Sequence, residues 1–146
     1  MIRLMIVAGL LTTAGCAGPA QLDAGDIEPA EAVRLAAAAA PDGVPGRFVL
    51  TVRSTGAQDG NVYLDSELDY RDQRTLVVEV RPFAQQQLAY RLDRPVGSAL
   101  VDHTIRVYGE ARRVRIDFTA AGRPTGQYYY QTHVAVDRAE QLQLLD

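Results

Sequence analysis

The chain of 146 residues contains no lysine and no tryptophan, and its only cysteine is Cys16. One cysteine excludes an internal disulfide, so the fold has to be held together by burial of apolar side chains. All 15 basic residues are arginine, and the 18 acidic residues leave a net charge of −3. This balance supplies no excess positive charge for attracting nucleic acid. The length and the 47% hydrophobic composition are typical of a single globular domain.

The sequence also lacks an apolar run long enough to span a membrane. Its longest N-terminal run, residues 4–11, is far short of the roughly 20 residues that a spanning helix needs. Arg3 precedes this run, and small residues follow it up to Cys16, which is the profile of an export signal. We therefore predict a signal peptide over residues 1–15.

The segment LTTAGC, residues 11–16, resembles the lipobox of bacterial lipoproteins, in which small residues precede a cysteine that is lipid-modified. Ala14 and Gly15 fit the pattern, and Thr13 stands where the family usually has leucine. The resemblance implies that the Cys16 thiolate takes a diacylglyceryl group and that cleavage occurs just before it. Several acyl chains would then anchor the protein stably to a membrane.

The residue after the lipidated cysteine bears on localisation. In the lipoprotein family an aspartate there often signals retention in the inner membrane, whereas this chain has Ala17. We therefore expect a lipid-anchored protein of the cell envelope, at the periplasmic face of the outer membrane. An ordinary secretory signal, cut after Ala17 or Ala20 with Cys16 discarded, is the alternative.

Residues 16–28 are mostly small and polar, and we interpret them as a tether to a single domain over residues 29–146. A helix is predicted over residues 29–40, with Asp26 as its cap and Pro41 as its end. A flexible alanine-rich linker is the alternative for this segment.

After residue 46 the apolar residues alternate with polar ones, which indicates strands. The predicted strands cover residues 48–53, 62–65, 76–81, 103–118 and 128–136, with a short helix near 83–92. TGAQDG and TAAGRPTGQ are interpreted as turns, Gly109 as a bulge, and AEQLQLL as a piece that returns to the first strand. The residues expected to face the core are Leu50, Val62, Leu64, Val78, Val107 and Val134.

This order of strands with one helix after the third is that of an OB-fold barrel. The segments DGVPGRFVLTVRS, GNVYLDSELDYRD, TIRVYGEARRV and AEQLQLL resemble bacterial OB-fold proteins, including staphylococcal-type nucleases and small periplasmic OB proteins. The resemblance covers residues 41–146. The predicted fold is therefore mainly β, a five-stranded OB-like barrel with a short helix between strands 3 and 4 and an N-terminal helix before the barrel. A fold of this kind does not by itself specify an activity.

The end of the second predicted strand and the segment after it carry four acids and two arginines: Asp65, Glu67, Asp69, Asp72, Arg71 and Arg74. These residue types could hold a metal ion in a phosphodiesterase, or they could form a solvated hairpin turn. The template of a calcium loop fails, because Tyr70 stands where that loop needs glycine. We interpret the segment as a turn and predict no metal site.

No catalytic residue is predicted. His103 and His133 have neither a nucleophile nor a second metal ligand at motif spacing, and the chain has no phosphate-binding glycine loop. No cofactor is expected, and the protein is not expected to be an enzyme.

The candidate ligand face consists of Tyr108, Arg113, Tyr129 and His133, from the last two predicted strands. We expect a non-catalytic binding or scaffolding lipoprotein whose partner is a protein, a glycan or a small anionic ligand. A metal-dependent phosphodiesterase using Asp65, Glu67 and Asp69, or a nucleic-acid-binding OB domain, is the alternative. The oligomeric state is left open.

Overall fold

The structure, a computed structural model, describes residues 22–146. The predicted signal peptide and the predicted lipidation site Cys16 lie outside the described residues. Along the described chain the elements are β1 (Asp26–Ile27), α1 (Pro29–Ala39), β2 (Val44–Thr51), β3 (Ser54–Gln58), β4 (Asn61–Asp65), β5 (Leu76–Val80), α2 (Pro82–Leu92), α3 (Val96–Leu100), β6 (Thr104–Ala120), β7 (Arg123–Val136), the 3-10 helix η1 (Ala139–Gln141) and β8 (Leu142–Leu144).

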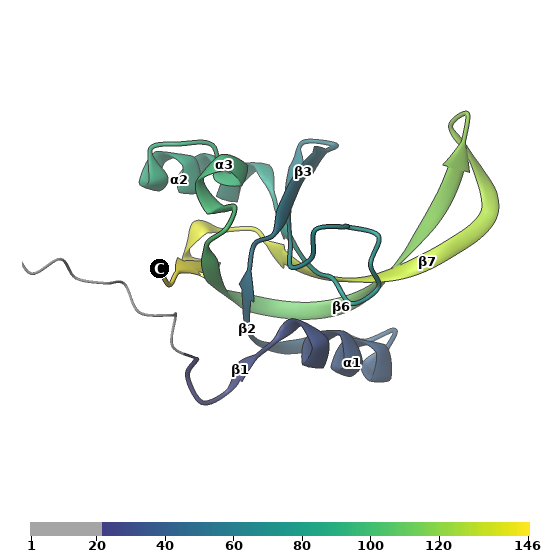
Figure 1. Ribbon diagram of the computed structural model, residues 1–146, viewed down its shortest axis with the longest axis horizontal. Helices are drawn as coiled ribbons and strands as arrows, with labels where there is room; N and C mark the ends of the chain where they lie inside the picture. Colours follow the sequence, from purple (N-terminus) through teal and green to yellow (C-terminus); the bar gives the residue numbers. More distant parts are fainter. Residues whose placement is uncertain (1–21) are drawn as a thin grey trace, which may run out of the picture.

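The eight strands of the described chain form one sheet in the order β1-β2-β6-β7-β5-β4-β3, with β8 paired to β6 (Figure 1). β5 runs parallel to β7, and β1 runs parallel to β2. The hydrogen-bonded path is open, since it ends at β1 and at β3. The prediction of a mainly β, five-stranded barrel is therefore wrong: the fold is mixed, with eight strands in an open sheet and three α-helices in the described residues.

The main reason for this error lies just after β2. The segment TGAQDG was expected to be a turn, but most of it forms β3, which pairs antiparallel with β4. The turn is confined to Asp59 and Gly60, whose φ angles of 52° and 81° suit a two-residue hairpin. Because Val52 and Arg53 alone separate β2 from β3, the chain changes partners there, from β6 to β4. Pairing with β4 outweighs the weak strand propensity of the β3 residues.

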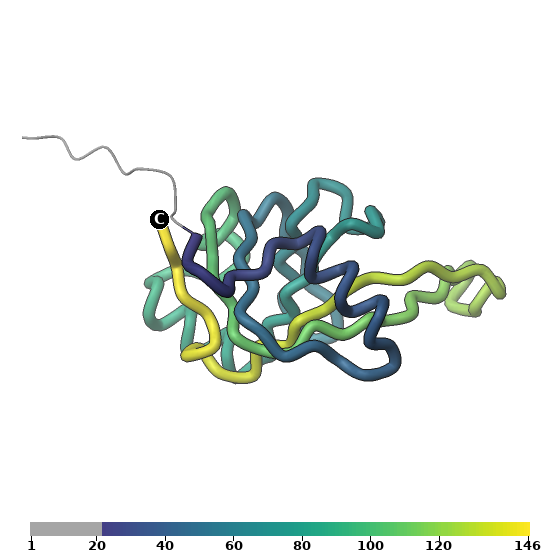
Figure 2. The backbone as a smooth tube through the Cα atoms, turned by 90° about the horizontal axis from the view of Figure 1, so that it is seen from below, coloured from purple at the N-terminus to yellow at the C-terminus, as the bar shows by residue number. Residues whose placement is uncertain are grey.

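The predicted turn TAAGRPTGQ is also much shorter in the structure. β6 continues to Ala120 and β7 begins at Arg123, so that only Ala121 and Gly122, with φ angles of 50° and 74°, form the turn. The paired ends of β6 and β7 form an arm that extends away from the rest of the protein (Figures 1 and 2). The sequence did not indicate this length because turn-forming residues occur inside the strands.

Gly109 does not form the predicted bulge, because β6 continues through it and pairs it with Gly46 of β2. The structure shows instead why no side chain fits at position 109. A Cβ atom at position 109 would lie 2.8 Å from Cγ1 of Val134, which is too close. The ladder between β6 and β7 is irregular farther along, between Asp117 and Thr119.

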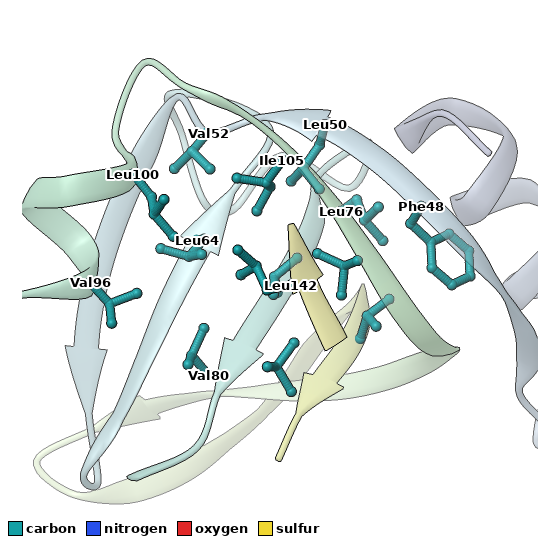
Figure 3. Close-up of a cluster of buried hydrophobic side chains, with 14 of the residues drawn as sticks. Phe48, Leu50, Val52, Leu64, Leu76, Val80, Val96, Leu100, Ile105 and Leu142 are labelled. Atoms are coloured by element: carbon teal, nitrogen blue, oxygen red, sulfur yellow. The ribbon is translucent and has the colours of Figure 1, made fainter. Parts of the chain in front are cut away.

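The core lies on one face of the sheet, as the predicted alternation required. Leu50, Leu64, Val78, Val107 and Val134 are buried, and Val62 packs against them while partly exposed. Figure 3 shows Leu50 and Leu64 in this cluster together with Ile105, Leu76 and Leu142. The prediction that these residues are buried is confirmed for five of the six, and Val62 is only partly buried.

The three α-helices pack against the sheet and contribute side chains to the core. Helix α1, predicted over residues 29–40, is confirmed and buries Ala32 and Ala36. Helix α2 is also confirmed and buries Ala84 and Leu88. The sequence did not predict α3, which begins directly after its N-cap residue Pro95.

The C-terminal segment AEQLQLL does return to the sheet, but to a different strand. It forms η1 and β8, and β8 pairs with residues 105–107 of β6 and not with the first strand. None of the helices formed by residues 22–146 is both long enough and apolar enough to cross a membrane.

The predicted role of Asp26 as a helix cap is also wrong, since Glu28 is the N-cap residue of α1. Asp26 lies in β1 and binds Arg47 of β2 and Arg106 of β6; the Arg106 Nη2 to Asp26 Oδ2 distance is 2.7 Å. These contacts, chiefly the hydrogen bond from Arg106, lower the pKa of Asp26 from 3.8 to about 2. The ion pairs of Asp26 therefore hold β1 against β2 and β6.

Candidate ligand-binding pocket

The face of the sheet opposite the core carries a row of side chains across four strands. In this row Ser54 of β3 is paired with Asp65 of β4, Asp65 with Val77 of β5, and Val77 with His133 of β7. Side chains of neighbouring residues in a strand point to opposite faces, so these four lie on the face that the core does not use. This row forms the floor of a pocket.

The pocket has a volume of about 580 Å³, within the range of small-molecule sites. Its walls come from β3, from the base of the arm and from the segment 66–75, which folds over the outer face of the sheet. The lining residues are Ser54, Thr55, Gly56, Ala57, Gln58, Tyr63, Asp65, Leu68, Tyr70, Val77, Ile116, Tyr129, Gln131 and His133.

Gly56 leaves the β3 side of the pocket without a side chain. A Cβ atom built at this position would meet nothing within 4 Å. Its neighbours Thr55 and Ala57 are small, and β3 is the last strand of the sheet on this side. Because Gly56 is paired with Tyr63 and lies two residues from Ser54, a side chain at position 56 would begin in open space on the pocket side of the sheet.

Asp65 is the buried acid of the pocket. Its exposed fraction is 4%, and its hydrogen-bond partner is the Ser54 hydroxyl, at 3.3 Å. That hydroxyl also lies 2.8 Å from the backbone oxygen of Glu67, and a serine has one proton to donate. Burial raises the pKa of the Asp65 carboxyl from 3.8 to about 6, against a smaller opposing effect of Ser54. The carboxylate is thus poorly compensated by its surroundings.

His133 and Gln131 form a second polar wall. Nε2 of His133 lies 2.8 Å from Oε1 of Gln131, whose Nε2 donates to the backbone oxygen of Tyr70 at 2.6 Å and to the hydroxyl of Tyr129 at 3.2 Å. Burial lowers the pKa of His133, and the Glu79 carboxylate, 3.9 Å from Nδ1, opposes this shift. The hydrogen bonds hold the segment 66–75 against β7 and fix this side of the pocket.

Three tyrosines from separate segments line the pocket. Tyr63 of β4 has its ring 6.2 Å from the His133 ring in an edge-on arrangement. Tyr129 of β7 packs against Phe118 of β6 at 5.2 Å between ring centres. Tyr70, in the segment 66–75, is half exposed at the mouth. The pocket therefore combines aromatic surface with one carboxyl group.

The structure divides the four residues of the predicted ligand face. Tyr129 and His133 lie in the pocket, whereas Tyr108 and Arg113 do not line it. Arg113 lies over the ring of Tyr130 at 3.7 Å, on the other face of the arm, because its partner in the ladder is Thr132. The ligand-binding role of these residues stays a prediction.

The acidic segment 66–75 is a loop, as expected for a turn. The backbone N–H of Arg71 donates to Asp69, and Asp72 pairs with Arg74 at 2.6 Å. The pKa of Asp72 is lowered to about 2, chiefly by the hydrogen bond from the Arg74 side chain. Within residues 22–146, no three histidine, cysteine or carboxylate side chains are grouped so that they could hold a metal ion.

Several pocket residues were not among the predicted site residues: Ser54, Gly56, Tyr63, Tyr70 and Gln131. The alternation in the second strand could have indicated Tyr63, because it shares with Asp65 the face opposite Val62 and Leu64. Gly56 belonged to a predicted turn, and Ser54 lay between that turn and the first predicted strand. Nothing in the sequence indicated that Tyr70 folds back over the sheet.

Comparison with known proteins gives little further information. No protein-family model matches the chain, and no curated protein matches its sequence. Among solved structures, the fold is similar to part of a protein described as an aspartyl-tRNA synthetase from Leishmania major Friedlin, with 9% sequence identity and a TM-score of 0.42. The match covers 90% of this chain and 23% of that chain.

Proposed function

We propose that this protein is a non-catalytic binding lipoprotein of the cell envelope, anchored through Cys16, whose domain holds its partner in the pocket around Asp65. The pocket supports a binding role because it is the right size for a ligand and presents both aromatic and polar groups. The lipobox resemblance supports the location and the anchor.

The sequence left three classes of partner open: a protein, a glycan and a small anionic ligand. The charge of the pocket disfavours the anionic ligand. No arginine lines the pocket, and its buried acid would repel a small anion. A protein side chain or a glycan is therefore the better partner. The isolated Asp65 carboxyl among the tyrosines is the observation that carries the proposal.

Filling the pocket tests this role. Gly56→Leu adds a side chain where the structure has open space, so the fold should be kept while the pocket is occupied. Ala38→Leu, on the exposed side of α1, adds a similar apolar group elsewhere and serves as the control. Both variants should show the melting transition of the wild type.

The immobilised wild-type protein and the two variants would be incubated with an envelope extract, and the eluted proteins and small molecules identified by mass spectrometry. We expect the same ligand with the wild type and with Ala38→Leu, and its loss with Gly56→Leu. Equal recovery by all three proteins, or no specific ligand with the wild type, would contradict the proposed binding role of the pocket.

A further inference from the structure

We propose that the pocket recognises an organic cation, an aliphatic ammonium group, with Asp65 as its counter-ion and the tyrosine rings as its walls. This inference rests on the proposed function, since it names the ligand class of the same pocket.

The first argument is the isolation of Asp65 compared with two partly buried acids of the sheet, Asp26 and Glu79. Asp26 is bound by two arginines, and Glu79 accepts a hydrogen bond from Asn61 at 2.8 Å. The carboxylate of Asp65 has one long hydrogen bond, from the Ser54 hydroxyl. The backbone oxygen of Glu67 competes for the same proton. A buried carboxylate without a partner is costly, and a cation placed beside it would offset that cost.

The second argument is the composition of the walls. The faces of aromatic rings attract ammonium groups, most strongly where water is excluded. Tyr63 and Tyr129 line the pocket with Asp65, and Ile116 and Leu68 supply apolar surface for an alkyl stem. The ligand class that fits an acid, aromatic rings and apolar surface together is an ammonium group on a hydrocarbon chain.

The third argument concerns the charges around the mouth. Arg71 is the nearest arginine of the loop, but its guanidinium group lies over the ring of Tyr70 and its Nε donates to the Tyr70 hydroxyl at 3.1 Å. It does not line the pocket. Asp69 of the same loop acts on Tyr129 together with Arg71, so the arginine charge beside the pocket is offset by a carboxylate. Neither the walls nor the mouth would repel a cation.

Two probe pairs test the charge requirement. Choline is compared with its neutral isostere 3,3-dimethylbutan-1-ol, and Nα-acetyl-lysine methylamide is compared with the norleucine analogue that lacks the amino group. Binding is measured by calorimetry and by NMR shifts of the pocket residues at pH 7.5. We expect at least one cation to bind about tenfold more tightly than its neutral analogue. Preference for choline would indicate a small molecule with a quaternary ammonium group, and preference for the lysine derivative would indicate a protein side chain.

Variants then assign the binding to the pocket. Asp65→Asn keeps the size of the side chain and should weaken cation binding about tenfold while leaving the neutral analogue unchanged. Tyr129→Leu should also weaken it. Asp42→Asn and Tyr90→Leu change the same residue types at exposed positions outside the pocket and should have no effect.

The pH profile provides an additional readout. Cation affinity should rise between pH 5 and pH 7.5 as Asp65 loses its proton, and this rise should be absent in Asp65→Asn. The other titratable or charged groups near Asp65 are His133 and the tyrosines of the walls, with Glu67, Asp69 and Arg71 in the loop. A rise that persists in Asp65→Asn would assign the effect to His133 and would count against Asp65 as the counter-ion.

The failure of this inference can be distinguished from that of the proposed function. Equal binding of cations and neutral analogues, no binding of either cation, or unchanged cation binding in Asp65→Asn would overturn the ammonium inference. In each case, a partner from the envelope extract that Gly56→Leu loses would still support the pocket as a binding site. Recovery of a glycan by that route would replace the ammonium ligand with a sugar.

Discussion

Asp65→Asn is expected to make the protein more stable at neutral pH, although it changes a buried polar residue. The folded state raises the pKa of Asp65 from 3.8 to about 6, so the folded protein holds this proton more tightly than the unfolded chain does. Stability contributed by the neutral carboxyl is fully present below pH 3.8 and is lost as the pH rises through about 6. Asparagine stays neutral, has almost the same shape and can still accept a hydrogen bond from Ser54.

The size of the effect follows from the two pKa values. The difference between 3.8 and about 6 corresponds to roughly 3 kcal/mol at 1.36 kcal/mol per pH unit. We treat this as an upper value, and expect Asp65→Asn to raise the free energy of unfolding by about 1–3 kcal/mol at pH 8. Near pH 4 the variant and the wild type should have almost the same stability.

Urea denaturation followed by circular dichroism at pH 4, 6 and 8 measures this dependence. The control is Asp42→Asn, at an exposed position, which should change the stability little at any of the three values. A less stable Asp65→Asn at pH 8, or a difference from the wild type that does not depend on pH, would refute the interpretation of Asp65 as an uncompensated buried carboxyl.

Four further variants test the fold and the anchor. Asp26→Asn should lower the free energy of unfolding at pH 7, because the folded state lowers the pKa of Asp26 to about 2. We expect a loss of only about 1–2 kcal/mol, since the cluster lies at the protein's edge, where solvent weakens ion pairs. The loss should vanish as the pH falls towards 2, and an unchanged urea midpoint at pH 7 would contradict it. Val78→Asp places a carboxylate at a position with no exposed surface and should abolish the melting transition, whereas a normal transition would show that the assignment of the core face is wrong. Gly109→Ala should lower the melting temperature through the close approach of Val134, whereas Gly56→Ala should leave it unchanged; equal effects would contradict the steric argument. Cys16→Ser should abolish incorporation of labelled fatty acid and membrane association while the domain folds normally; a free N-terminus at Gly18 or Gln21 of the wild type, found by mass spectrometry, would rule out the lipoprotein prediction.

In the sheet, the local alternation of apolar and polar residues correctly predicted which side chains face the core. The predicted core positions in all five predicted strands face the core because a side-chain period of two is a local property of extended chain. Helices α1 and α2 were likewise predicted, since each begins with a proline in its first turn and contains good helix formers. Neither prediction needed knowledge of which strands are neighbours.

The errors occur where pairing or packing outweighs local preference. Residues of β3 and the outer arm have the composition of turns, yet antiparallel partners hold them as strands. Asp26 resembles a helix cap in the sequence, and two arginines from distant strands bind it instead. The two arginines lie 21 and 80 residues from Asp26 along the chain, so no local pattern indicates them. The partners in the two hairpins are close in sequence, but strand pairing there outweighs the turn-like composition.

The sequence by itself determined the alternation that separates the core face from the outer face, and it placed Asp65, Tyr129 and His133 among the polar positions. Only the tertiary structure decided that strands β4, β5 and β7 lie side by side, and that the loop after β4 covers them to form a pocket. The tertiary structure also decided the raised pKa of Asp65. The protonation of a carboxyl depends on the charges and the water around it, and those are set by residues that are distant in the sequence.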